Sequence, residues 1–95
     1  DGSTTSLPTS FALKQNYPNP FNPSTVISYQ LPVDSRVTLK VYNTLGEEVA
    51  TLVDGFQVAG YRAAEWNANG MPSGVYQVRM VAGDFSEVRK VVLMK

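Results

Sequence analysis

The sequence predicts an all-β fold, an antiparallel β-sandwich of about seven short strands, on three observations. Apolar and polar residues alternate with a period of two along much of the chain, which is typical of strands with one buried face. Turn residues such as Gly, Pro, Asn and Asp recur between these segments at regular spacing. No segment long enough for a stable helix carries a helical stripe of apolar residues.

Length and composition limit the possible functions. The 95 residues are enough for one domain with a modest core. Eight basic and eight acidic side chains give a net charge of zero, which argues against nucleic acid and an anionic membrane surface as partners. No apolar run approaches the ~20 residues of a membrane helix, so we expect no direct membrane insertion. The balance is uneven, because Gly74–Lys95 holds four cations and two carboxylates.

The chain divides into a linker and one domain. Residues Asp1–Ser10 are small, hydroxylated and nearly without apolar bulk, so we expect a flexible linker there and the domain over Phe11–Lys95. The first residue is not methionine, and nothing near it resembles a signal peptide. We therefore expect the chain to be the C-terminal piece of a longer protein.

After a short strand expected over Phe11–Gln15, the segment Asn16–Pro23 contains three prolines. Proline fixes φ and has no backbone donor, so the segment is expected to be an extended crossing with turns and not a central strand. Tyr17 and Phe21 are expected to clamp the rim of the core. A rigid crossover is favoured over a proline-rich recognition ligand, because such ligands usually lie in flexible sequence.

The central strands follow from the alternation of apolar residues. They are expected over Thr25–Leu31, Arg36–Asn43, Glu47–Val53 and Tyr61–Asn67, with a turn at Asn43–Gly46 and a loop holding Phe56 between Asp54 and Gly60. The inward residues of the first two strands are expected to be Ile27, Tyr29, Leu31, Val37, Leu39 and Val41. Trp66 is expected to anchor the core by packing, with ligand stacking as the alternative.

Val75–Val81 and Phe85–Met94 form a predicted terminal β-hairpin. A three-residue loop, Ala82–Asp84, would put Arg79 opposite Glu87 and Gln77 opposite Arg89. A two-residue loop would bring Glu87 and Arg89 onto the apolar face, and burying unpaired charges is costly, so the three-residue loop is favoured. The three-residue loop leaves Lys90 on the apolar face, opposite Tyr76. There Lys90 would either extend its charged end from the sheet margin into solvent or serve to contact a partner. The apolar face would hold Tyr76, Val78, Met80, Val88, Val92 and Met94.

Tyr76 adds a detail of architecture. It enters its strand after the corner Pro72-Ser73-Gly74, where its hydroxyl could return to a backbone group just upstream. Such a tyrosine corner is found in immunoglobulin-like sandwiches. The prediction is therefore an immunoglobulin-like or fibronectin-like sandwich.

The residues argue against catalysis and metal binding. There is no histidine or cysteine to serve as base or thiolate nucleophile. Ser86 and Lys90 would lie about 13 Å apart along a strand, outside hydrogen-bond reach. The segment Asn67–Gly70 faintly resembles a calcium loop but holds no carboxylate. We predict no catalytic residue, metal or cofactor, and expect function to lie in binding, scaffolding or being recognised.

The succession of motifs resembles a known family. The motifs are Asn16-Tyr17-Pro18-Asn19-Pro20-Phe21-Asn22-Pro23, Val37–Asn43, Leu45–Val49, Gly74-Val75-Tyr76, and Lys90 with a terminal Lys95. Together they resemble the type A C-terminal sorting domain of the type IX secretion system, a family that overlaps with the immunoglobulin-like domain of the flagellar hook-capping protein. The resemblance covers Phe11–Lys95. Asn43 and Glu47 depart from it, because the family often has an aspartate and an arginine there.

The resemblance implies that the domain is an address. Such domains follow exported enzymes and adhesins of Bacteroidetes-like bacteria, are recognised in the periplasm and direct passage across the outer membrane. A sortase-like cysteine peptidase commonly removes them and the cargo is attached to surface lipopolysaccharide, so Asp1–Ser10 would separate cargo from signal and contain or adjoin the cleavage point. The resemblance assigns signal recognition to Gly74, Tyr76, Gly83, Lys90 and Lys95, and an N-terminal motif to Tyr17, Pro18, Asn19 and Pro20.

On this interpretation Lys90 and Lys95 form a basic edge on the last strand, where a receptor could pair with exposed backbone groups. Two other functions stay open. One is a structural module that self-associates like the hook-cap domain. The other is a carbohydrate-binding accessory module of an extracellular enzyme, with Tyr42, Tyr61 or Trp66 as stacking platforms.

Overall fold

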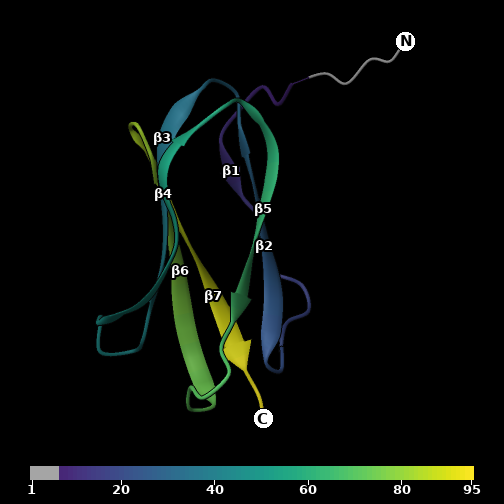
Figure 1. Cartoon of the computed structure of the whole chain (residues 1–95), viewed down its shortest axis with the longest axis vertical. Helices are drawn as coiled ribbons and strands as arrows, with labels where there is room; N and C mark the ends of the chain where they lie inside the picture. The colour runs from purple at the N-terminus through teal and green to yellow at the C-terminus, as the bar shows by residue number, and fades with distance from the viewer. Residues whose placement is uncertain (1–6) are drawn as a thin grey trace.

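The computed structural model describes residues 7–95 and confirms the all-β prediction, with seven strands in two antiparallel sheets and no helix in that range (Figure 1). The expected linker over Asp1–Ser10 lies mostly outside the described residues. Within its described part, Pro8 is buried and the Ser10 carbonyl accepts a hydrogen bond from Gln30 Nε2 at 3.0 Å. The strands are β1 (Ala12–Leu13), β2 (Ser24–Leu31), β3 (Ser35–Tyr42), β4 (Glu48–Gln57), β5 (Gly60–Asn67), β6 (Gly74–Ala82) and β7 (Phe85–Leu93).

The two sheets form the layers of a sandwich. One sheet has the strand order β1-β2-β5 and the other β4-β3-β6-β7, so β7 is an edge strand. In Figure 1 the four-stranded sheet lies on the left and the three-stranded sheet on the right. The described chain enters at the top of this view and ends at Lys95 at the bottom, so the two ends lie at opposite poles of the domain.

The core lies between the sheets and follows the predicted alternation in β2 and β3. All six predicted inward residues of these strands are buried. Trp66 is only 4% exposed, which confirms packing as its role and removes it as a stacking platform. The turn after β3 also forms as predicted, with a φ of 84° at Gly46 that a residue with a side chain adopts only at a steric cost.

Strand β4 is longer than predicted. It continues through Asp54, Gly55 and Phe56, where a loop was expected, because its backbone stays paired with β3 as far as Ser35. Phe56 lies opposite Arg36 on the outer face and is 69% exposed. The glycine and the aspartate that indicated a loop are accommodated as edge-strand positions, where one side of the backbone is unpaired.

The register predicted for the terminal hairpin is wrong by one residue. Ala82 pairs with Phe85, so the loop has two residues, and Gly83 takes the positive φ of 59° that such tight turns require. Glu87 and Arg89 therefore do face the same side as Met80 and Val78. Val88, Val92 and Met94 lie in the other phase, away from the core.

The two charges are tolerated on this side because they are neither unpaired nor fully buried. Arg89 Nη2 lies 3.0 Å from Glu87 Oε2, and the two side chains are 39% and 35% exposed. Arg89 Nε also donates to the Leu13 carbonyl at 2.8 Å. The same register turns Phe85 inward, where its ring stacks on Phe11 at a centroid distance of 5.3 Å. Lys90 then lies opposite Gln77 on the outer face and not opposite Tyr76.

Candidate recognition site

The N-terminal motif lies against the outer edge of the last strand. We call the segment Asn16–Pro23 the strap. Its Phe21 N–H donates to the Val92 carbonyl at 3.0 Å, and the Met94 N–H donates to the Phe21 carbonyl at 3.0 Å, which forms a parallel bridge to β7. Two segments at opposite ends of the sequence are therefore joined into one structural unit.

Side chains extend this contact along the edge. Asn19 Oδ1 accepts a hydrogen bond from the Val92 N–H at 3.0 Å, and Gln15 Nε2 donates to the Lys90 carbonyl at 2.8 Å. The edge of β7 is thus covered from Lys90 to the C-terminal end. The backbone N–H and C=O groups of Ser86 and Val88 also point away from β6 at this edge, but residues 7–95 supply no hydrogen-bond partner for them. Within residues 7–95, the edge of the last strand is therefore hydrogen-bonded in one half and unpaired in the other, which we call its open half.

A buried polar network fixes the strap to β2. Asn16 is 4% exposed, and its Nδ2 donates to Thr25 Oγ1 at 2.9 Å and to the Pro18 carbonyl at 3.1 Å. Thr25 Oγ1 itself donates to the same Pro18 carbonyl at 2.8 Å. In the described chain every buried side-chain polar atom has a partner. Because its prolines have no backbone N–H to donate, the strap is held to β2 by hydrogen bonds from the Asn16 amide and the Thr25 hydroxyl.

An aromatic cluster joins the strap to Tyr76, one of the predicted signal residues. Phe21 is 2% exposed and packs on Trp66 at a ring-centroid distance of 5.4 Å, and Trp66 meets Tyr76 edge-on at 5.3 Å. The Tyr76 hydroxyl donates to the Pro72 carbonyl at 2.7 Å, which confirms the predicted tyrosine corner. Phe21 holds the core rim as predicted.

The expectation for Tyr17 is wrong, because its side chain is 80% exposed. Its backbone pairs with Val26 in both directions, at 3.0 and 2.9 Å, and Val26 belongs to the outward phase of β2. The pairing therefore turns Tyr17 toward solvent. Pro18, Asn19 and Pro20 are also exposed.

The structure brings some of the predicted signal residues together and separates others. Gly74 lies opposite Leu93, next to the end of the chain, and the Lys95 N–H donates to Ser73 Oγ at 3.1 Å. Tyr76 is buried beside them. Gly83 lies at the far tip of the hairpin, and Lys90 lies between these two ends on the outer face.

Sequence reasoning missed the residues that hold the strap in place. The alternation of residues does not distinguish Gln15 or Thr25, and Asn16 stands out only as part of the motif. A usable signal was present, because a proline-rich segment has few backbone donors and needs nearby amide or hydroxyl side chains to pair its carbonyls.

The departures at Asn43 and Glu47 leave the turn intact. Asn43 Oδ1 accepts from the N–H groups of Leu45 and Glu47 at 2.9 and 3.0 Å, and Asn43 Nδ2 donates to Glu47 Oε1 at 2.8 Å. A neutral amide and a carboxylate thus make a direct contact across the turn.

Residues 7–95 contain no group of carboxylates that could hold a metal ion. The segment Asn67–Gly70 is a turn, in which the Asn69 N–H donates to Asn67 Oδ1 at 2.9 Å. No helix in the described range is long and apolar enough to cross a membrane.

The fold and the strap define a class of protein: a small β-sandwich module whose N-terminal motif and C-terminal strand form one surface. The family model described as secretion system C-terminal sorting domain matches residues 15–94, and the chain belongs to this family. Membership gives the domain the role of a sorting signal for type IX secretion, which involves the secretion machinery and a cargo in the parent chain. The cargo of such a signal is exported across the outer membrane to the cell surface or beyond. No curated protein sequence matches the chain.

Proposed function

We propose that the domain is a non-catalytic address that the secretion machinery reads in the periplasm, before a sortase-like peptidase cleaves near the linker and the cargo is attached to the cell surface. The docking of the strap on β7 carries this proposal. Because of it, the exposed residues Tyr17–Pro20 lie on the same edge of the domain as the end of the last strand. A single receptor surface can therefore contact both motifs.

The signal residues divide into two kinds by exposure. Three of them act by stabilising the fold. Gly74 begins β6, Tyr76 forms the buried tyrosine corner, and Gly83 forms the tight turn of the hairpin. The second kind is exposed and contacts the secretion machinery: Lys90, Lys95 and the strap residues Tyr17–Pro20. Substituting the first kind should therefore lower stability and secretion together, whereas substituting Lys90, Lys95 or Tyr17 should lower secretion alone. Asn19 also accepts a hydrogen bond from the Val92 N–H, so its substitution should lower stability as well.

The position of the linker suits cleavage without loss of the signal surface. The domain begins at the pole opposite Lys95 (Figure 1), and the contacts of Pro8 and Ser10 favour a cleavage point before Pro8. A peptidase acting there would lie far from the receptor that holds the strap and the end of β7.

A reporter fusion tests the proposal. We expect a periplasmic reporter fused in front of residues 1–95 to reach the cell surface in a host with this secretion system, and to stay in the periplasm when the translocon is deleted. The matched fusion carries Tyr17→Ala, at an exposed position of the strap, and should reach the surface less than the wild-type fusion. Retention of the wild-type fusion in the periplasm, or surface display of a reporter without the domain, would contradict the proposal.

One observation favours a second candidate, the carbohydrate-binding module. Tyr61 is 63% exposed and borders a shallow hollow together with Lys14 and Arg62. An exposed ring of this kind can stack on a sugar. Retardation in polysaccharide affinity gels that Tyr61→Ala removes would support this function, and unchanged mobility of the wild-type chain would rule it out.

A further inference from the structure

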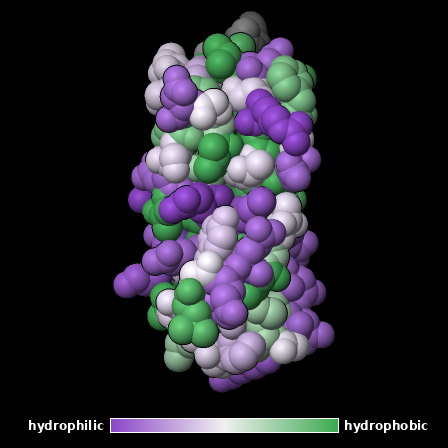
Figure 2. All heavy atoms as spheres, turned by 90° about the vertical axis from the view of Figure 1, so that its left-hand side faces the viewer, coloured by the Kyte–Doolittle hydropathy of each residue, from purple (hydrophilic) through white to green (hydrophobic). Residues whose placement is uncertain are grey.

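The outer face of the four-stranded sheet is divided electrostatically into two halves. Figure 2 shows this face as mainly hydrophilic, with single hydrophobic residues scattered over it. On the half made by β4 and β3, each cation has a carboxylate partner. Arg36 Nη2 lies 3.1 Å from Asp54 Oδ1, and Lys40 Nζ lies 3.4 Å from Glu48 Oε1.

The half made by β6 and β7 has two cations and no carboxylate. Arg79 and Lys90 are exposed, and neither forms an ion pair with any residue in the range 7–95. Arg79 lies opposite Val88, two residues from Lys90 on the neighbouring strand, so the two cations are diagonal neighbours within reach of one ligand. Arg79 also lies opposite Lys40 on β3, whose charge Glu48 offsets, so Arg79 itself is left without a carboxylate partner within residues 7–95.

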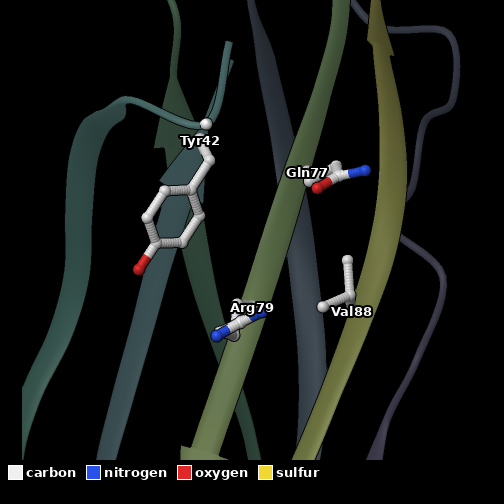
Figure 3. Close-up of a pocket in the computed structure, with 5 residues that line it drawn as sticks. Tyr42, Gln77, Arg79 and Val88 are labelled. Carbon is white, nitrogen blue, oxygen red and sulfur yellow. The ribbon is translucent and has the colours of Figure 1, made fainter. Parts of the chain in front are cut away.

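A hollow of about 230 Å³ opens at Arg79. In Figure 3 the Tyr42 ring stands on one side of it and the Gln77 and Val88 side chains on the other, with the end of Arg79 between them. Gly46, in the turn after β3, completes the lining. This volume is below that of typical small-molecule sites and suits a single side chain. We call it the Arg79 hollow.

We propose that the Arg79 hollow binds the carboxylate of a glutamate or aspartate presented by an extended segment of a protein partner. A guanidinium binds a carboxylate through two parallel hydrogen bonds, and the Gln77 amide and Tyr42 hydroxyl are further donors in the lining. The Tyr42 ring and Val88 contact the aliphatic part of the acidic side chain. Lys90 adds a second positive charge at the rim. The inference rests on the proposed function, since the partner is a component of the secretion machinery.

The open half of the β7 edge argues for a protein segment over a lipid surface. Ser86 and Val88 present backbone groups at this edge, and an extended peptide that pairs there places alternate side chains on the outer face beside Val88 and Lys90. The open half of the edge ends at Lys90, whose carbonyl accepts a hydrogen bond from Gln15 Nε2. A membrane surface offers no backbone to pair with, and the net charge of zero gives the domain no overall attraction to anionic lipid.

Titration of the isotopically labelled chain with a capped peptide of alternating valine and glutamate tests the site directly. We expect the amide resonances of Gln77, Val88 and Lys90 to shift, and the affinity to fall at least tenfold with Arg79→Glu plus Lys90→Glu. Arg36→Glu, which reverses a charge on the paired half, is the matched control and should change the affinity less than twofold. Equal binding of the double variant, or of a peptide with glutamine for glutamate, would overturn the proposal.

Titrations with anionic phospholipid vesicles and with inorganic phosphate test whether the Arg79 hollow binds a lipid headgroup or a free anion and not a peptide carboxylate. Neither should shift these resonances at the peptide's half-saturating concentration. Vesicle binding that the double variant abolishes would reassign the hollow to a membrane and overturn the proposal.

The reporter host then separates this inference from the proposed function. We expect Arg79→Glu plus Lys90→Glu to reduce surface reporter at least tenfold, with Arg79→Lys plus Lys90→Arg close to wild type and with the thermal unfolding midpoint of every variant unchanged. If the wild-type fusion is displayed and the charge-reversed one is displayed equally well, the Arg79 hollow is not the contact although the domain is the signal. If the wild-type fusion is not displayed, the proposed function itself fails.

Discussion

Tyr29 is the residue in which packing and ionisation are most directly linked. Its side chain is 2% exposed, and its hydroxyl donates to Gln57 Oε1 at the margin of the core. Burial disfavours the phenolate and raises the pKa of Tyr29 above its ordinary value of 10.0. In the unfolded chain the hydroxyl ionises near its ordinary value, so the folded state must hold it neutral at alkaline pH.

A pH dependence of stability follows from this raised pKa. A folded-state pKa above the unfolded value gives stability that is complete below the unfolded pKa and is lost as pH rises through the folded pKa. We expect the free energy of unfolding to decline above about pH 10 and to decline less steeply in Tyr29→Phe. Urea unfolding at several alkaline pH values measures both slopes. Identical slopes for the two proteins would show that Tyr29 does not contribute.

The structural interpretation of Lys90 depends on the register of the terminal hairpin. The alternation of β7 allows two registers that differ by one residue, and the argument against burying unpaired charge selected the wrong one. Two contacts make the observed register tolerable: Glu87 pairs with Arg89, and Leu13 supplies a carbonyl from the other sheet to Arg89. The first contact is local and could have been considered, whereas the second requires the fold. In the observed register Lys90 is an ordinary outer-face residue with no conflict to explain.

At the scale of elements, the central strands were predictable and the strap's position was not. The inward residues of β2 and β3 alternate without ambiguity, so their faces follow from the sequence alone. The prolines of the strap exclude a central strand, but they do not indicate which edge it covers. The Asn19–Val92 contact joins residues 73 positions apart, and no local pattern encodes it.

Two asparagines of the strap allow a matched test of how it is held. Asn16→Ala removes donors to Thr25 Oγ1 and the Pro18 carbonyl inside a buried site, and should cost about 1–3 kcal/mol of unfolding free energy. Asn19→Ala removes one exposed hydrogen bond and should cost about 0.5–1.5 kcal/mol. Urea unfolding compares them. A larger loss for Asn19→Ala would mean that the β7 contact, and not the buried network, anchors the strap.

For the whole molecule, the sandwich was predictable, whereas the site was predictable only as two separate motifs. The tyrosine corner at Tyr76 and the core position of Trp66 follow from local pattern and residue type. The ring contacts that join Phe21 through Trp66 to Tyr76 are long-range packing. They make the strap part of the core, so a domain that loses the strap or the end of β7 loses stability as well as signal.

Truncation of the last six residues, Lys90–Lys95, is therefore predicted to unfold the domain. Val91 and Leu93 are 0% and 1% exposed, and losing their burial costs about 3–6 kcal/mol, against a total stability of about 5–15 kcal/mol for a typical domain. The strap also loses both backbone bonds to β7. We expect the truncated chain to show no cooperative thermal transition by circular dichroism, while Lys90→Gln plus Lys95→Gln keeps the wild-type midpoint. A cooperative transition in the truncated chain would show that the end of β7 is dispensable for folding. In that case a loss of secretion on truncation would report on recognition alone. If the truncated chain unfolds as expected, only the point variants separate recognition from folding.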